Sequence, residues 1–202
     1  MKELEIKRLL IQELANQEGV TALASEFVFD FGRRRADMIS IANEFSVGYE
    51  IKSYFDKLTN LAAQLHSYLM IFDYVYVVCD KRHLEKVREI APKKVGLYLA
   101  RGNELVLKRK AKLNKKLDIL VLLDAFPLPV LQATFSMRAR SKLDLCHKII
   151  SCNSLSSVRG KLISYISDKY FEQTRFFHED AGDLVTLDDV YSLFSTAPQV
   201  LE

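Results

Sequence analysis

The chain has 202 residues, of which 49% are hydrophobic and 27% charged, so it can bury a core and is not a disordered protein. Its 7 Gly and 4 Pro exclude collagen-like and Gly/Pro-rich linker proteins. The net charge of +3 permits a polyanionic partner without requiring one. No apolar run approaches the roughly 20 residues of a membrane span, no signal peptide is apparent, and the 3 Cys lack a disulfide-scaffold spacing. We therefore expect a cytoplasmic protein with no membrane partner.

Hydrophobic periodicity predicts an α/β core over residues 1–110. A helical repeat of leucines opens the chain, and three aromatic or β-branched segments joined by short turns follow, as in an antiparallel meander. The next strand comes after a helix with Asp56 as its N-cap, so it should pair in parallel and give a mixed central sheet. The predicted order is helix 3–17, strands 26–31, 35–41 and 45–53, helix 57–72, strand 74–79, helix 83–90, and strands 95–100 and 105–108.

Residues 111–202 return to a helical period and predict a helical region packed on this core. We expect helices over 117–126, 127–137, 141–150 and 154–174, and a short helix after Thr186. Ser154 is the predicted N-cap of the longest helix, and Gly160 is its weak point. That helix carries more apolar residues than a lone surface helix requires, so it is a candidate seam for a homodimer or a partner protein. These residues are Leu162, Ile163, Tyr165, Ile166, Tyr170 and Phe171.

Three ionisable residues fall on neighbouring strands of the predicted meander. Side chains alternate along a strand, so Glu50 and Lys52 share one face, and Asp37 on the preceding strand can lie opposite them. The alternative is a cross-strand salt bridge on an exposed face, which contributes only about 0–1 kcal/mol. The apolar neighbours Ile39 and Ile51 favour an inner position. Carboxylates placed there need a cation, and oxygen ligands suit Mg²⁺ or Mn²⁺. A lysine beside such an ion can orient or deprotonate a water that attacks a phosphodiester.

This pattern resembles the PD-(D/E)xK nuclease superfamily, with Asp37, Glu50 and Lys52 at the motif positions. The resemblance implies a restriction-endonuclease-like core with the order α-β-β-β-α-β, and it covers about residues 3–80. A second match lies in the next helix, where Gln64 and Tyr68 fit the Q-x-x-x-Y element of the RecB-like branch. These two residues share a helical face and could position the motif strand or contact DNA. Otherwise they form an ordinary helix edge.

The resemblance also implies a metal site made by Asp37, Glu50 and the carbonyl of Ile51. The histidine ligand of the RecB-like branch is absent from the first helix, which leaves Glu26 and Glu13 as competitors for the fourth position. We favour Glu26, because it lies on the sheet near Asp37. Ala36 stands in place of the proline that names the superfamily.

Two basic segments are candidate DNA contacts. Arg33, Arg34 and Arg35 form a turn beside the proposed site, where they would meet phosphates or simply be solvated. Lys108, Arg109 and Lys110 begin the densest basic run, which would extend a DNA track or protect an edge strand from aggregation. Ser53, directly after the motif, completes the set of residues expected to bind or position DNA.

The sequence therefore predicts a Mg²⁺- or Mn²⁺-dependent nuclease that hydrolyses DNA, in phage defence, restriction or repair. In the alternative, the same fold is a non-catalytic DNA-binding or docking subunit of a larger nucleic-acid-processing complex. No nucleotide-binding glycine motif occurs in the chain, so neither hypothesis includes a nucleotide-driven motor.

Overall fold

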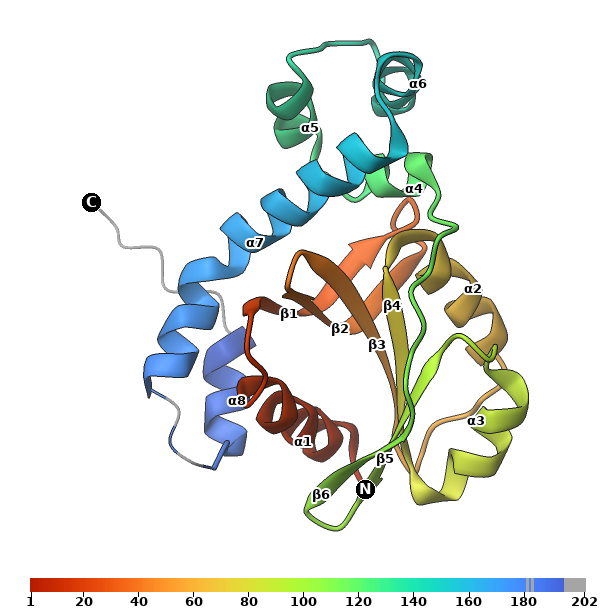
Figure 1. The fold of residues 1–202 in the computed structure, drawn as a ribbon, viewed down its shortest axis with the longest axis vertical. Helices are drawn as coiled ribbons and strands as arrows, with labels where there is room; N and C mark the ends of the chain where they lie inside the picture. The colour runs from red at the N-terminus through yellow and green to blue at the C-terminus, as the bar shows by residue number, and fades with distance from the viewer. Residues whose placement is uncertain (181, 183, 195–202) are drawn as a thin grey trace.

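The computed structural model describes residues 1–180, 182 and 184–194, and its strands form one six-stranded sheet in the order β1-β2-β3-β4-β5-β6 (Figure 1). Strands β1, β2 and β3 pair antiparallel, β3, β4 and β5 pair in parallel, and β6 returns antiparallel to β5. The predicted meander and mixed sheet are thereby confirmed. The strands are Val20–Phe29 (β1), Arg34–Ala42 (β2), Phe45–Lys52 (β3), Tyr74–Asp80 (β4), Gly96–Arg101 (β5) and Glu104–Arg109 (β6).

Helices cover both faces of the sheet. One face packs against α2, α3, α4 and the first half of α7, and the other packs against α1, α8 and the end of α7 (Figure 1). The protein is thus an α/β structure whose C-terminal helices share the core of the sheet. The helices are Glu3–Ala15 (α1), Leu61–Ile71 (α2), Leu84–Ile90 (α3), Ile119–Asp124 (α4), Leu128–Phe135 (α5), Lys142–Cys152 (α6), Leu155–Asp180 (α7) and Leu187–Phe194 (α8), with a 3-10 turn, η1, at Lys81–His83.

Helix α7 closes the β1 edge of the sheet. The backbone N–H of Leu23, which points away from β2, donates a 2.9 Å hydrogen bond to the hydroxyl of Thr174. Thr174 is buried, with 2% of its surface exposed. An uncovered edge strand exposes unpaired backbone N–H and C=O groups that can pair with a strand of another chain. In the middle of β1, helix α7 covers this edge.

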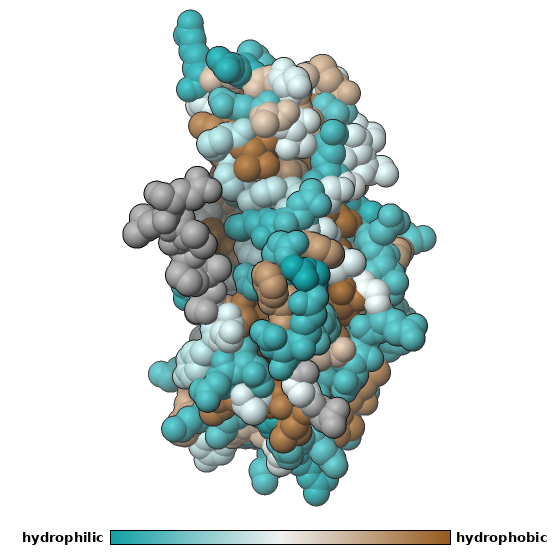
Figure 2. Space-filling model, turned by 90° about the vertical axis from the view of Figure 1, so that its left-hand side faces the viewer, coloured by the Kyte–Doolittle hydropathy of each residue, from teal (hydrophilic) through white to brown (hydrophobic). Residues whose placement is uncertain are grey.

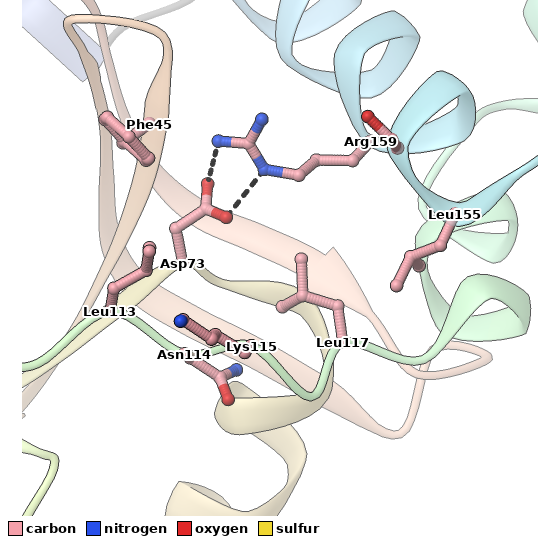
Figure 3. A pocket seen from close by; sticks show the side chains of 9 residues that line it. Phe45, Asp73, Leu113, Asn114, Lys115, Leu117, Leu155 and Arg159 are labelled. Carbon is pink, nitrogen blue, oxygen red and sulfur yellow. Dashed lines mark hydrogen bonds and ion pairs between the residues drawn. The ribbon is translucent and has the colours of Figure 1, made fainter.

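An ion pair between a half-buried arginine and a buried aspartate fixes the start of α7. The guanidinium of Arg159 donates to the carboxylate of Asp73, just before β4, at 2.7 Å and 2.9 Å (Figure 3). The same carboxylate accepts hydrogen bonds from the backbone N–H and hydroxyl of Ser46. Beside the pair lies a cavity of about 240 Å³ with Phe45 and Leu155 in its wall. Because Asp73 is only 2% exposed, its charge depends on these partners.

Three predicted boundaries were wrong. Strand β1 begins at Val20 rather than at residue 26. The first half of this strand contains Ala22 and Ala24, whose intrinsic preference is for helices, so the sequence pattern did not mark it as a strand. Helix α2 begins at Leu61 rather than at residue 57, and Asp56 instead accepts a 2.6 Å hydrogen bond from the N–H of Ser53 in a turn. Helix α7 continues to Asp180, six residues past its predicted end, because its last turns still pack against α1 and α8.

The predicted apolar seam on α7 was largely wrong as well. Leu162, Ile163 and Ile166 are buried against the sheet and α4, and Tyr165 and Tyr170 pack on the same core, so these side chains are used within the chain. The surface in Figure 2 is mostly hydrophilic with scattered hydrophobic side chains.

In the part of the chain that the structure describes, no helix combines the length and the apolar character that crossing a bilayer requires.

Two glycine substitutions should have opposite effects on stability. A Cβ at Gly48 in β3 would overlap with the ring of Phe72, so Gly48→Ala should lower the free energy of unfolding by about 1–3 kcal/mol. A Cβ at Gly160, on the exposed side of α7, would meet no atom of the described residues. Gly160→Ala should therefore stabilise the protein by about 0.5–1 kcal/mol, as expected for a helix interior. Urea denaturation measures both values, and equal effects would contradict this packing.

Candidate active site

The three motif residues meet at one end of the sheet. We call this end the carboxyl edge, because β3, β4 and β5 all finish there, at Lys52, Asp80 and Arg101. Strand β2 runs the other way, so its first residues, including Asp37, lie at the same edge. The strand order and the hydrogen bond from the Ile51 N–H thus place Asp37 at the same edge as Glu50 and Lys52.

The carboxylate of Asp37 lies where β2 and β3 separate. The last paired residues of this ladder are Met38 and Tyr49. One step further, the N–H of Ile51 donates to Asp37 Oδ2 at 2.6 Å, so a side chain takes the place of a backbone carbonyl. Ile51 remains in register with Val78 of β4 on its other side. The separation opens the sheet at the point where the charged side chains lie.

Glu50 and Lys52 are both buried on β3. Glu50 is 1% exposed and Lys52 is 8% exposed, and Glu50 Oε1 lies 2.6 Å from Lys52 Nζ. The Tyr68 hydroxyl also interacts with Glu50, and no further hydrogen bond from the described residues reaches its two oxygens. A buried carboxylate is costly unless all its lone pairs are satisfied, so this group has capacity for a further ligand.

Tyr68 of α2 contacts both motif strands from the face of the sheet that α2, α3 and α4 cover. Its hydroxyl accepts a hydrogen bond from the N–H of Asp37 at 3.2 Å and donates to the carbonyl of Tyr49 at 3.5 Å. Tyr68 thus bridges the two strands at their point of separation, which agrees with the predicted positioning role. Burial and the charges of Glu50 and Asp37 raise the pKa of Tyr68 well above its ordinary value, so the hydroxyl keeps its proton. Gln64, four residues earlier on α2, is half-buried.

Burial is the main reason that Asp37 binds protons more tightly than an ordinary aspartate. Burial, followed by the negative charge of Glu50, raises the pKa of Asp37 from 3.8 to about 7. The Ile51 N–H and the Lys52 ammonium oppose this rise, and Glu3 adds to it. At neutral pH the Asp37 carboxyl therefore exchanges readily between its protonated and its ionised form.

A third acidic residue comes from the start of α1. Carboxylate oxygens of Glu3, Glu26 and Asp37 all lie within 4.8 Å of one another. The predicted proximity of Glu26 to Asp37 is confirmed, although Glu26 is exposed and has a left-handed backbone with φ of 56°. The sequence reading missed Glu3, since only the docking of α1 brings it there. The competitor Glu13 lies ten residues further along the same helix, about 15 Å away, where its charge acts on Tyr49 and Tyr98 instead.

Cations surround this acidic group. Lys7 Nζ lies 3.5 Å from Glu26 and 3.7 Å from Glu3, and Arg35 Nε lies 2.5 Å from Glu26. The predicted arginine turn was wrong for two of its three residues, because Arg34 and Arg35 both belong to β2 and only Arg33 lies in the turn. Arg33 is exposed, and Arg34 donates to the hydroxyl of Ser67 on α2 at 3.3 Å. Arg33 and Arg35 thus remain at the surface beside the site.

Ser53 and Arg109, which were also predicted to contact DNA, form hydrogen bonds within the protein. Ser53 is 5% exposed and begins the turn closed by Asp56, so its backbone shapes the loop after β3. Arg109 donates to the carbonyls of Val95, Ala91 and Pro92, which ties β6 to the end of α3.

The Lys108–Lys110 segment does not continue the candidate site along the sheet. Arg109 pairs with Leu97 at the beginning of β5, so this segment lies at the opposite end of the sheet from Lys52. Lys108 and Lys110 are exposed on or just after β6, the edge strand. Their position fits the alternative role, in which lysines protect an edge strand from aggregation.

The pKa of Asp37 gives a signed prediction for stability. Between pH 4 and pH 7 the folded chain binds more protons at this group than the unfolded chain does, so its contribution to stability falls as pH rises through that window. Asp37→Asn should match the wild type near pH 4 and exceed it by about 1–3 kcal/mol at pH 8. Urea denaturation in EDTA at both pH values tests this. A difference independent of pH would contradict the burial of an ionised Asp37.

The match to known proteins extends over nearly the whole chain. The model of the family described as bacteriophage P4 protein cII matches residues 1–193. Protein cII of Enterobacteria phage P4 is 27% identical over an alignment of 190 residues, which covers 88% of this chain and 71% of that protein. Among solved structures, the SPO1766 protein of unknown function from Silicibacter pomeroyi is 18% identical, with coverage of 90% of this chain and 97% of that one and a TM-score of 0.44. The extent of the family match shows that this chain belongs to the bacteriophage P4 protein cII family.

Proposed function

We propose that this protein is a metal-dependent nuclease that hydrolyses phosphodiester bonds at the carboxyl edge of its sheet. The observation that carries the proposal is the buried Glu50, paired at one oxygen with Lys52, beside the half-buried carboxylate of Asp37, whose pKa burial raises to about 7. With its pKa raised to about 7, Asp37 is readily protonated, and a divalent cation bound to its oxygens would hold it in the ionised form. When both Asp37 and Glu50 are ionised, Lys52 pairs with only one of them, so such an ion would complete the compensation of their charge.

The order of elements also supports the proposal. The chain runs α1-β1-β2-β3-α2-β4 with Asp37 on β2 and Glu50 and Lys52 on β3, which is the arrangement of the PD-(D/E)xK nuclease core that the sequence resembles. Tyr68 on α2 bridges the two motif strands, as the Q-x-x-x-Y resemblance leads one to expect. The restriction-endonuclease-like assignment of this core is part of the proposal.

The chemical roles follow from the positions of the side chains. Asp37 and Glu50 would hold Mg²⁺ or Mn²⁺, and the carbonyl of Ile51, Glu26 and Glu3 are further candidate ligands. The bound ion would neutralise a phosphate oxygen and lower the pKa of a water. Lys52, held 2.6 Å from Glu50, would orient the attacking water or stabilise the charge that develops on the phosphate. Arg33 and Arg35, at the surface beside the acidic group, would contact the polynucleotide backbone.

The decisive experiment is a cleavage assay with purified protein, plasmid and single-stranded DNA, and millimolar Mg²⁺ or Mn²⁺. Lys52→Ala and Asp37→Asn should each reduce the rate at least about 100-fold, because both remove stabilisation of the transition-state charge. The control is Lys86→Ala, which removes an exposed lysine paired with Glu89 on α3. Its rate should equal that of the wild type.

The same assay can also contradict the nuclease proposal and support the alternative function. DNA binding without cleavage under either ion would identify a non-catalytic DNA-binding module on this fold. Cleavage that persists unchanged in Lys52→Ala would assign the activity to a contaminant or to other residues.

Glu3 provides a separate test of the metal site. If Glu3 is a ligand, Glu3→Gln should raise the Mn²⁺ concentration needed for half-maximal thermal stabilisation by about tenfold. Glu13→Gln is a matched control, because it removes the same charge from the same helix but about 15 Å away. Equal shifts in the two variants would mean that Mn²⁺ responds only to the overall charge of α1, and the direct role of Glu3 would then be wrong.

A further inference from the structure

Two aromatic side chains stand exposed directly after the candidate catalytic strand. Tyr54 and Phe55 follow Lys52 by two and three residues, and they are 45% and 73% exposed. Their rings meet edge to face with centroids 5.3 Å apart. Two adjacent exposed rings beside the candidate site form a continuous apolar surface, which makes them a candidate contact for a ligand of that site.

The backbone holds this aromatic pair in place. The N–H of Tyr54 donates to the carbonyl of Met1 at 3.0 Å. Ser53 and Asp56 close the turn with a 2.6 Å hydrogen bond to the Asp56 carboxylate and a 3.2 Å backbone hydrogen bond. The pair is therefore presented by an ordered turn, and a ligand would bind there without first ordering a loop.

A cation completes the surface. The guanidinium of Arg82, in the middle of η1 after β4, lies 4.7 Å from the centre of the Tyr54 ring and donates to the Tyr54 carbonyl at 2.9 Å. Arg82, Lys57 and Lys81 are all exposed. We name Tyr54, Phe55 and Arg82 the aromatic platform. It combines flat apolar rings with positive charge, which is the chemistry that recognises the bases and phosphates of an unpaired strand.

We propose that the aromatic platform stacks an unpaired nucleobase of a single-stranded polynucleotide whose adjacent phosphate lies at Asp37, Glu50 and Lys52. In a duplex both faces of each base are covered by its neighbours, so only an unpaired or splayed base offers a free face to Phe55. The inference rests on the proposed function for the identity of the neighbouring site. It adds the substrate class, namely single-stranded DNA or RNA rather than intact duplex.

The size of the platform argues against a second protein chain as its occupant. A stable protein interface buries about 800 Å² on each partner, whereas the platform consists of two aromatic side chains and one arginine. One planar base with its phosphate matches this area and charge, and each stacked base commonly changes affinity by one to two orders of magnitude.

The chain contains no tryptophan, so a single substitution creates a specific reporter. Phe55→Trp should retain affinity for unlabelled oligo-dT and oligo-U. The fluorescence of the introduced Trp should be quenched as either strand saturates the protein. Phe55→Ala should weaken binding of both strands about tenfold, measured by anisotropy with labelled oligonucleotides. Blunt duplex of equal length should bind more weakly than either strand and should be insensitive to Phe55→Ala. All measurements are made in EDTA, so that no strand is cut.

Phe176 on α7 offers a matched control. It is 52% exposed, and the guanidinium of Arg175 lies 4.5 Å from its ring centre, so it reproduces the exposed aromatic–arginine pair at another place on the surface. Phe176→Ala should leave affinity unchanged, and Phe176→Trp should not be quenched by oligonucleotide. Circular dichroism of each variant checks that the fold is retained.

Several outcomes would overturn the inference. These are unquenched Trp in Phe55→Trp at saturation, equal losses in Phe55→Ala and Phe176→Ala, preferential binding of duplex, or a change of oligomeric state in gel filtration in place of a change in affinity. Failure of the proposed function is recognised separately. If the Trp fluorescence is quenched but no metal-dependent cleavage occurs, the platform binds single strands and the proposed nuclease activity is wrong. If cleavage occurs without quenching, the nuclease proposal holds and the platform proposal is wrong.

Discussion

Glu50 lies on β3 in the interior of the sheet with 1% of its surface exposed, and the arrangement around it depends on that burial. A carboxylate in this position needs compensation, which Lys52 supplies only in part. The nearby Asp37 adds a second charge and takes over a backbone hydrogen bond where β2 and β3 part. A fold that tolerates such a group usually keeps it for a purpose other than stability, because an apolar pair would pack at lower cost.

Two of the helices that cover the sheet also support this edge of it. Tyr68 from α2 bridges the parting strands on one face, and the start of α1 brings Glu3 to the other side of Asp37. The carbonyl of Met1 fixes the turn at Tyr54, so the amino terminus also shapes the loop that leaves β3. At the far end of the sheet, the Asp73–Arg159 pair and α7 secure the opposite side. The charged edge is thus supported by residues from distant parts of the chain.

Membership of the bacteriophage P4 protein cII family and the chemistry of this edge are separate findings. The family match places the whole chain with known relatives, whereas the proposed nuclease activity rests on particular side chains. Function resides in a site rather than in a fold, so the positions of Asp37, Glu50 and Lys52 bear on activity more directly than overall similarity does. The aromatic platform begins two residues after Lys52, so in the proposal it would extend the same edge along a bound strand.

The sequence by itself determined the local parts of this picture. Alternation along a strand is enough to put Glu50 and Lys52 on one face, and a short turn between strands brings Asp37 back opposite them. It did not determine contacts between segments far apart in the chain. The arrival of Glu3 beside Asp37, the exclusion of Glu13, and the position of Lys108–Lys110 at the opposite end of the sheet were decided by the docking of α1 and by strand order. The physical reason is that periodicity reports which face of an element is buried, but not which element covers it or at which end its charges meet.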